Sequence, residues 1–129
     1  MREPRGSAAV ELALVLPLAL MVALALLQVG LLTRDALVVH GAAREGAREA
    51  AVSVDATRIR EAALRGGGGL APDRTKVAVE RSGDVGDPVT VRVTYRAPVI
   101  VPFIEWLFPD EVVVVSEATM RQETDGASS

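Results

Sequence analysis

The chain contains no cysteine, which excludes a disulfide framework, a thiolate metal site and a cysteine nucleophile. Aromatic residues make up only 3% of the sequence, so the side chains available for a core are mainly Val, Leu, Ile and Ala. The formal net charge is -3, and a nucleic-acid partner is therefore not expected.

Groups that carry out catalysis are also scarce. The single histidine, His40, has no carboxylate at ligand spacing, which favours a surface histidine over a catalyst or a metal ligand. Ser7, Ser53 and Ser82 form no plausible nucleophile–base set around it. Four glycines at 66–69 lack the Lys-Ser/Thr of a phosphate-binding loop and favour a flexible linker. We expect no enzyme activity, no metal and no cofactor.

An uncharged apolar run extends from Leu12 to Thr33. At 1.5 Å per residue, about 22 helical residues span roughly 33 Å, enough to cross the hydrocarbon core of a bilayer. Pro17 is tolerated in such a helix, and Gln28 is the only strongly polar side chain within the run. The sequence thus predicts one transmembrane helix at residues 7–33.

The charges on either side of the run predict its orientation. Arg2 and Arg5 precede it with only Glu3 to oppose them, whereas Arg34 and Asp35 cancel after it. The positive-inside rule places the N-terminus in the cytoplasm and the following domain outside the inner (cytoplasmic) membrane.

A cleaved secretory signal is the alternative to a permanent anchor. Ala23-Leu24-Ala25 has the small-x-small form of a signal cleavage site, and cleavage there would give a secreted binding domain that starts near Leu26. The apolar run continues beyond this site, so we favour the anchor.

Glu11 stands at the membrane entrance of the predicted helix. An ionisable residue at bilayer depth costs roughly 2.5–3.5 kcal/mol on insertion scales and less near the interface. Either this side chain reaches the headgroups, or it has a positively charged partner.

Gly6-Ser7-Ala8-Ala9-Val10-Glu11 followed by an apolar run resembles the cleavage motif of type IV pilin-like proteins. The run RGSAAVELALVLPL and the segment HGAAREGAREAAV at residues 40 to 52 resemble the TadE-like family, the pseudopilins of tight-adherence (Flp-type) pilus systems. The resemblance covers the first 52 residues, with one departure: Leu12 stands where many relatives carry an aromatic residue.

The resemblance implies a processing event and a set of partners. A prepilin peptidase would cut between Gly6 and Ser7, and Glu11 would be the acid near the start of the mature chain. The implied partners are the inner membrane, the prepilin peptidase, other pilin-like subunits and the pilus assembly platform. Cutting would expose an amine on Ser7 with a reference pKa of about 7.7–8.0, and this cation can compensate the Glu11 carboxylate of a neighbouring subunit.

Small residues form a helical stripe after the apolar run, because Ala42, Gly46 and Ala50 recur at every fourth position. Such a stripe lets another element approach closely. The stripe can pack on the protein's own sheet, and it can join Glu11 and Leu12 as a contact between subunits. The two readings can both hold.

The remainder predicts a small domain of class α+β. A second helix starts at Asp55, and alternating apolar residues predict three strands of a mostly antiparallel sheet. The expected organisation is a leader at 1–6, the transmembrane helix at 7–33, juxtamembrane and second helices at 34–65, a Gly-rich linker at 66–73, the sheet at 74–121 and a disordered tail at 122–129.

The Pro-bounded apolar stretch from Pro98 to Pro109 contains Phe103, Trp106 and Phe108. These aromatic residues predict a contact with the membrane surface or a partner subunit, or else a buried crossover between the second and third strands.

Two functions remain from the sequence. The first is a minor pilin or pseudopilin of a tight-adherence type IV pilus system. The second is a single-pass accessory or receptor protein whose outer domain binds a partner.

Overall fold

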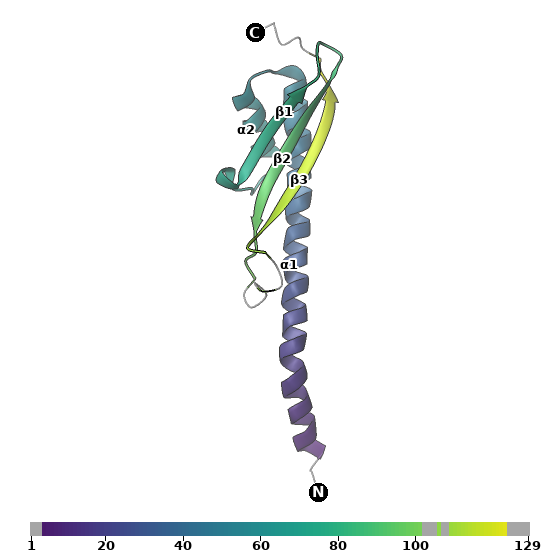
Figure 1. Ribbon diagram of the computed structural model, residues 1–129, viewed down its shortest axis with the longest axis vertical. Helices are drawn as coiled ribbons and strands as arrows, with labels where there is room; N and C mark the ends of the chain where they lie inside the picture. Colours follow the sequence, from purple (N-terminus) through teal and green to yellow (C-terminus); the bar gives the residue numbers. More distant parts are fainter. Residues whose placement is uncertain (1–3, 102–105, 107–108, 124–129) are drawn as a thin grey trace.

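The computed structural model describes residues 4–101, 106 and 109–123. Within them the order of elements is α1 (Pro4–Val52), α2 (Ala56–Gly66), the 3-10 turn η1 (Pro72–Arg74), β1 (Thr75–Arg81), β2 (Pro88–Pro98) and β3 (Glu111–Arg121). The first half of α1 projects away from a small domain that is built on its second half (Figure 1). The predicted α+β class, with a long N-terminal helix, a short helix and a three-stranded antiparallel sheet, is confirmed.

Helix α1 is continuous over 49 residues, and Pro17 lies inside it. At 1.5 Å per residue it is roughly 73 Å long, more than twice the thickness of a hydrocarbon core. Its first half is Leu-, Val- and Ala-rich and exposed, whereas its second half buries one face. The buried face consists of Val39, Ala42, Ala43, Gly46, Ala47, Ala50 and Ala51.

The sheet has the order β1-β2-β3, and both strand pairs are antiparallel. In the central strand β2, alternate residues are buried, so the period-two pattern in the sequence corresponds to one covered face. The opposite face carries cross-strand polar pairs. Arg92 pairs with Glu117, and the hydroxyls of Thr90 and Thr119 lie 2.8 Å apart.

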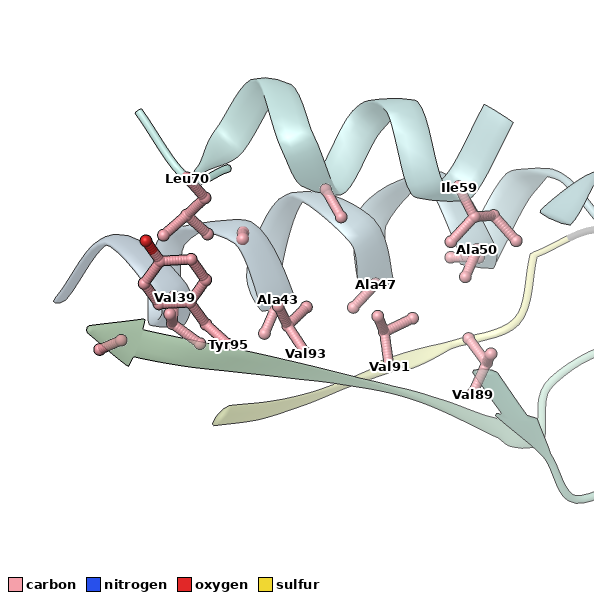
Figure 2. Close-up of a cluster of buried hydrophobic side chains, with 14 residues drawn as sticks. Val39, Ala43, Ala47, Ala50, Ile59, Leu70, Val89, Val91, Val93 and Tyr95 are labelled. Atoms are coloured by element: carbon pink, nitrogen blue, oxygen red, sulfur yellow. The ribbon is translucent and has the colours of Figure 1, made fainter. Parts of the chain in front are cut away.

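Both helices cover the same face of the sheet, and α2 packs beside α1 (Figures 1 and 2). Valines from β2 meet alanines from α1, and Ile59 of α2 closes one end of this layer (Figure 2). Because alanine has a short side chain and glycine has none, α1 can lie close to both the sheet and α2. The buried cluster comprises Val39, Ala42, Ala43, Ala47, Ala50, Ala51, Ile59, Ala63, Leu70, Val89, Val91, Val93, Tyr95 and Ala97.

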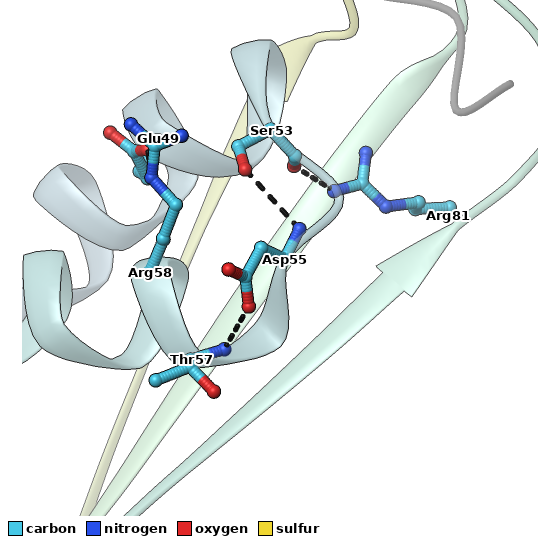
Figure 3. Close-up of polar contacts among 6 residues, drawn as sticks. All are labelled: Glu49, Ser53, Asp55, Thr57, Arg58 and Arg81. Carbon is cyan, nitrogen blue, oxygen red and sulfur yellow. Dashed lines mark hydrogen bonds and ion pairs between the residues drawn. The ribbon is translucent and has the colours of Figure 1, made fainter. Parts of the chain in front are cut away.

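The turn between α1 and α2 is held by side chains that satisfy helix ends (Figure 3). The Asp55 carboxylate accepts a hydrogen bond from the Thr57 backbone N–H at 2.9 Å, as the predicted helix start requires. At the end of α1, the Arg81 guanidinium donates to the carbonyls of Ala50 at 2.9 Å and Ser53 at 2.6 Å. A strand residue therefore satisfies carbonyls that have no partner within the helix.

Two expectations about connecting segments need correction. A Cβ on Gly66 would lie 2.5 Å from the Glu45 Cβ, and the Gly67 N–H donates to the Ala63 carbonyl at 2.9 Å. These glycines form a packed helix end and not a flexible linker. Gln122 is buried and the Glu123 N–H donates to Ala51 at 2.8 Å, so both belong to the domain. The rest of the expected tail, 124–129, lies outside the described residues.

Candidate functional site

Gly6 and Ser7 lie in the first turns of α1, and both are exposed. The N–H groups of a first helical turn have no partner within the helix, so this end opens more easily than the interior. A Cβ on Gly6 would meet no atom within 4 Å. The predicted cleavage position is thus accessible, and residues 1–3 of the expected leader lie outside the described residues.

Glu11 lies one helical turn beyond Ser7, on the same side of α1. Within the part of the chain that the structure describes, no hydrogen bond or ion pair reaches the Glu11 carboxylate. The adjacent Leu12 is 62% exposed. Both residues are therefore free of the folded domain and available to a second molecule.

The apolar run that follows is exposed as well. α1 is long and apolar enough to cross a membrane, and none of the residues in its most apolar window is buried. Leucine and valine side chains cover this half of the helix on all sides. A helix that is apolar all round and unburied in its own chain fits a single membrane span.

Residues 6–48 match the family model described as TadE-like protein. Over these residues, about a third of the chain, the sequence is similar to TadE-like proteins. The match starts at Gly6 and includes Glu11, the exposed apolar run and most of the second half of α1. It confirms the family that the N-terminal motifs resemble, and it supports an involvement in tight-adherence pilus assembly in general. No curated protein and no solved structure matches the chain significantly.

The small-residue stripe of the TadE-like helix belongs to the core. Ala42, Gly46 and Ala50 are buried in the chain's own domain. A Cβ on Gly46 would lie 3.0 Å from Val91 of β2 and 3.1 Å from Ala63 of α2. Of the two readings left open by the sequence, the structure shows packing within the chain. A subunit contact through these three residues, like that through Glu11 and Leu12, stays a prediction.

The isolated His40 is exposed on α1, and its Nδ1 lies 3.1 Å from the Ser116 hydroxyl of β3. Among the described residues, no group of three or more His, Cys, Asp or Glu side chains is placed to hold a metal ion. His40 is therefore a surface residue with a hydrogen-bond partner in β3.

Gln28 has a role that sequence reasoning missed. Its side chain is 1% exposed although the surrounding TadE-like helix surface is open. The Gln28 Oε1 accepts hydrogen bonds from the backbone N–H groups of Ile100 at 3.3 Å and Val101 at 3.2 Å. An amide alone in an apolar run was the available signal, but its partner lies 72 residues away in the sequence.

The stretch between β2 and β3 is not simply buried. Val101 is 4% exposed, whereas Ile100 is 65% and Trp106 is 72% exposed. Phe103 and Phe108 lie outside the described residues. A buried crossover describes Val101 but not Ile100 or Trp106, and a membrane or partner contact of these two residues stays a prediction.

Proposed function

We propose that the chain is a minor pilin or pseudopilin of a tight-adherence type IV pilus system. It is cut by a prepilin peptidase between Gly6 and Ser7 and assembles through its N-terminal helix. In this role it is the substrate of an enzyme and catalyses no reaction itself. It lies in the inner membrane with its N-terminus in the cytoplasm, and its partners are other pilin-like subunits and the assembly platform.

One observation carries this proposal: the TadE-like match begins at Gly6 and runs through a helix whose first half the chain leaves uncovered. Exposed Gly6 and Ser7 provide a reachable bond. Glu11 provides an acid without a partner in the described chain. Cleavage would create the complementary cation, the Ser7 amine, on every subunit. Processing and assembly are thereby linked through a single electrostatic pair.

The test is the N-terminus of the protein from cells that contain a prepilin peptidase. Intact mass should show a chain that begins at Ser7, and the Gly6→Val variant should keep Met1 to Gly6. A β-branched side chain at the cut obstructs the close approach of the peptidase to the backbone. Gly30→Val is the matched control, because Gly30 also lies on α1 with no atom near its Cβ position. This control should be cut normally.

A start at Met1 in assembled wild-type protein would contradict the proposal. The chain would then be a single-pass accessory or receptor protein with an extracytoplasmic partner-binding domain. A start near Leu26 without membrane association would instead indicate a secreted domain.

A further inference from the structure

In the connection between β2 and β3, the first residues after β2 lie beside the apolar half of α1. The Val99 N–H donates to the Asp110 carbonyl at 3.2 Å and closes the neck of the connection. The next two N–H groups, of Ile100 and Val101, donate to the Gln28 Oε1. One side chain of the predicted membrane span thus fixes the backbone of a loop that belongs to the sheet.

The position of Gln28 along α1 sets the depth of this contact. It lies roughly 26 Å beyond Glu11 along the helix axis and roughly 9 Å before Arg34. A hydrocarbon core of about 30 Å that begins near Glu11 therefore ends beyond Gln28. At that depth, backbone N–H groups must find partners within the protein, and the Gln28 oxygen is such a partner.

The described apolar side chains after β2 differ in exposure. Val101 is buried, whereas Ile100 and Trp106 are 65% and 72% exposed. On α1, the neighbours of Gln28 are also open, with Leu27 54% and Val29 49% exposed. Ile100, whose N–H is bonded to Gln28, therefore lies beside exposed apolar residues of the membrane span.

We propose that Ile100 and Trp106 dock on the lipid bilayer at the end of the span distal to the N-terminus. Lipid is the occupant because this surface adjoins a helix face that is already lipid-facing once α1 is inserted. Tryptophan is enriched at this level of a membrane, where its ring faces both lipid and water. The domain thus has a second membrane contact besides α1, and Gln28 holds that contact in place. The inference rests on the membrane insertion of α1 and not on cleavage or subunit assembly.

Trp106 is the only tryptophan of the chain, so it reports on its own surroundings. The full chain is reconstituted in phosphatidylcholine vesicles whose acyl chains carry bromine near the headgroups. We expect bromine to quench the Trp106 fluorescence, with equal strength at high and low protein-to-lipid ratio. Quenching by aqueous acrylamide alone would overturn the proposal. Protection that disappears on dilution in lipid would also overturn it and would indicate a partner subunit.

The variant Ile100→Asp tests the lipid contact directly. A carboxylate at this depth is unfavourable, so bromine quenching of Trp106 should fall severalfold. The matched control is Val85→Asp, since Val85 is also exposed, at 51%, but lies in the turn between β1 and β2. Far-ultraviolet circular dichroism establishes that both variants are folded. Equal quenching in Ile100→Asp and wild type would contradict the docking, whatever the result for the Gly6 cleavage.

Discussion

Glu11 and Gln28 are two polar side chains on the apolar half of α1, and only Gln28 has a partner within the described chain. The Gln28 amide is buried and accepts from two backbone N–H groups. Glu11 is exposed near the start of the apolar run, where its charge is costly unless it is compensated. Gln28 therefore has an intramolecular role, and the contrast supports the proposed intermolecular role of Glu11.

We predict that Glu11→Leu leaves membrane insertion and cleavage intact but prevents assembly. The leucine fits the apolar run. The variant removes only the carboxylate, which in the proposal pairs with the Ser7 amine of a neighbouring subunit. Co-purification with the other pilin-like subunits should fall at least about tenfold, the factor that corresponds to about 1.4 kcal/mol. Leu14→Met is the control, because it alters an exposed apolar residue of the same run without changing charge.

Glu11→Asp should give an intermediate yield, since it keeps the charge on a shorter side chain. If Glu11→Leu co-purified as the wild type does, the pairing role of this carboxylate would be refuted. Cleavage to Ser7 would remain a separate result.

At the level of elements, α1 and α2 approach each other through glycine and alanine. A Cβ on Gly41 would lie 3.1 Å from the Gly66 carbonyl, and one on Gly67 would lie 2.8 Å from the Ala42 Cβ. Side chains this small let two helices pack with their backbones nearly in contact. The ion pair of Arg58 with Glu49, at 3.5 Å, lies at the exposed edge of the same interface and contributes little.

We predict that Gly66→Ala destabilises the domain whereas Gly68→Ala does not. The new methyl group on Gly66 would lie 2.5 Å from the Glu45 Cβ and 3.0 Å from the Gly41 carbonyl. Overpacking of this kind costs about 1–3 kcal/mol. A Cβ on Gly68 meets no atom within 4 Å. Thermal unfolding of both variants measures the difference, and equal melting temperatures would show that the two helices are not packed this closely.

Local patterns were sufficient to predict the elements but not all their neighbours. The uncharged run predicted the membrane-capable part of α1, and alternation in Val89, Val91 and Val93 predicted a half-buried strand. The Ala42, Gly46 and Ala50 stripe was ambiguous, because small residues permit close approach to any partner. Gly66 was misread as part of a linker, since the composition of a glycine run does not reveal a packed helix end.

The candidate site also has a part that the sequence predicted and a part that it did not. The motif around Gly6 and Glu11 is contiguous in the sequence, so it was visible without a structure. The contact of Gln28 with Ile100 and Val101 depends on the register of the β2–β3 pair and on where α1 crosses the sheet. A local periodicity in the sequence does not indicate a contact between residues more than 70 positions apart.

At the level of the whole molecule, one continuous helix serves two environments. The first half of α1 contributes nothing to the buried cluster, which begins on this helix at Val39. Leu32 and Val38 pack against that cluster from its edge. The domain therefore depends on the second half of α1, while the first half is long and apolar enough to cross a membrane and, in the proposed function, also contacts other subunits.

This division predicts that a fragment of residues 34–123 folds without the membrane span. It keeps every member of the buried cluster and loses the packing of Leu32 and the hydrogen bonds to Gln28. Each hydrogen bond to Gln28 contributes about 1 kcal/mol, so the fragment should melt cooperatively but at a lower temperature than the full chain. Circular dichroism in mild detergent, which shields Ile100 and Trp106, measures both transitions.

A fragment of residues 45–123 provides the control, because it removes Val39, Ala42 and Ala43, which are all 0% exposed. Full burial of a valine side chain alone is worth about 1.5–3 kcal/mol, and the two alanines belong to the same buried cluster. Because small domains have a net stability of only about 5–15 kcal/mol, the combined loss should abolish cooperative unfolding. A cooperative transition in this shorter fragment would show that the sheet and α2 form a core without α1. Failure of residues 34–123 to fold would instead show that the membrane-facing half of α1 supports the domain.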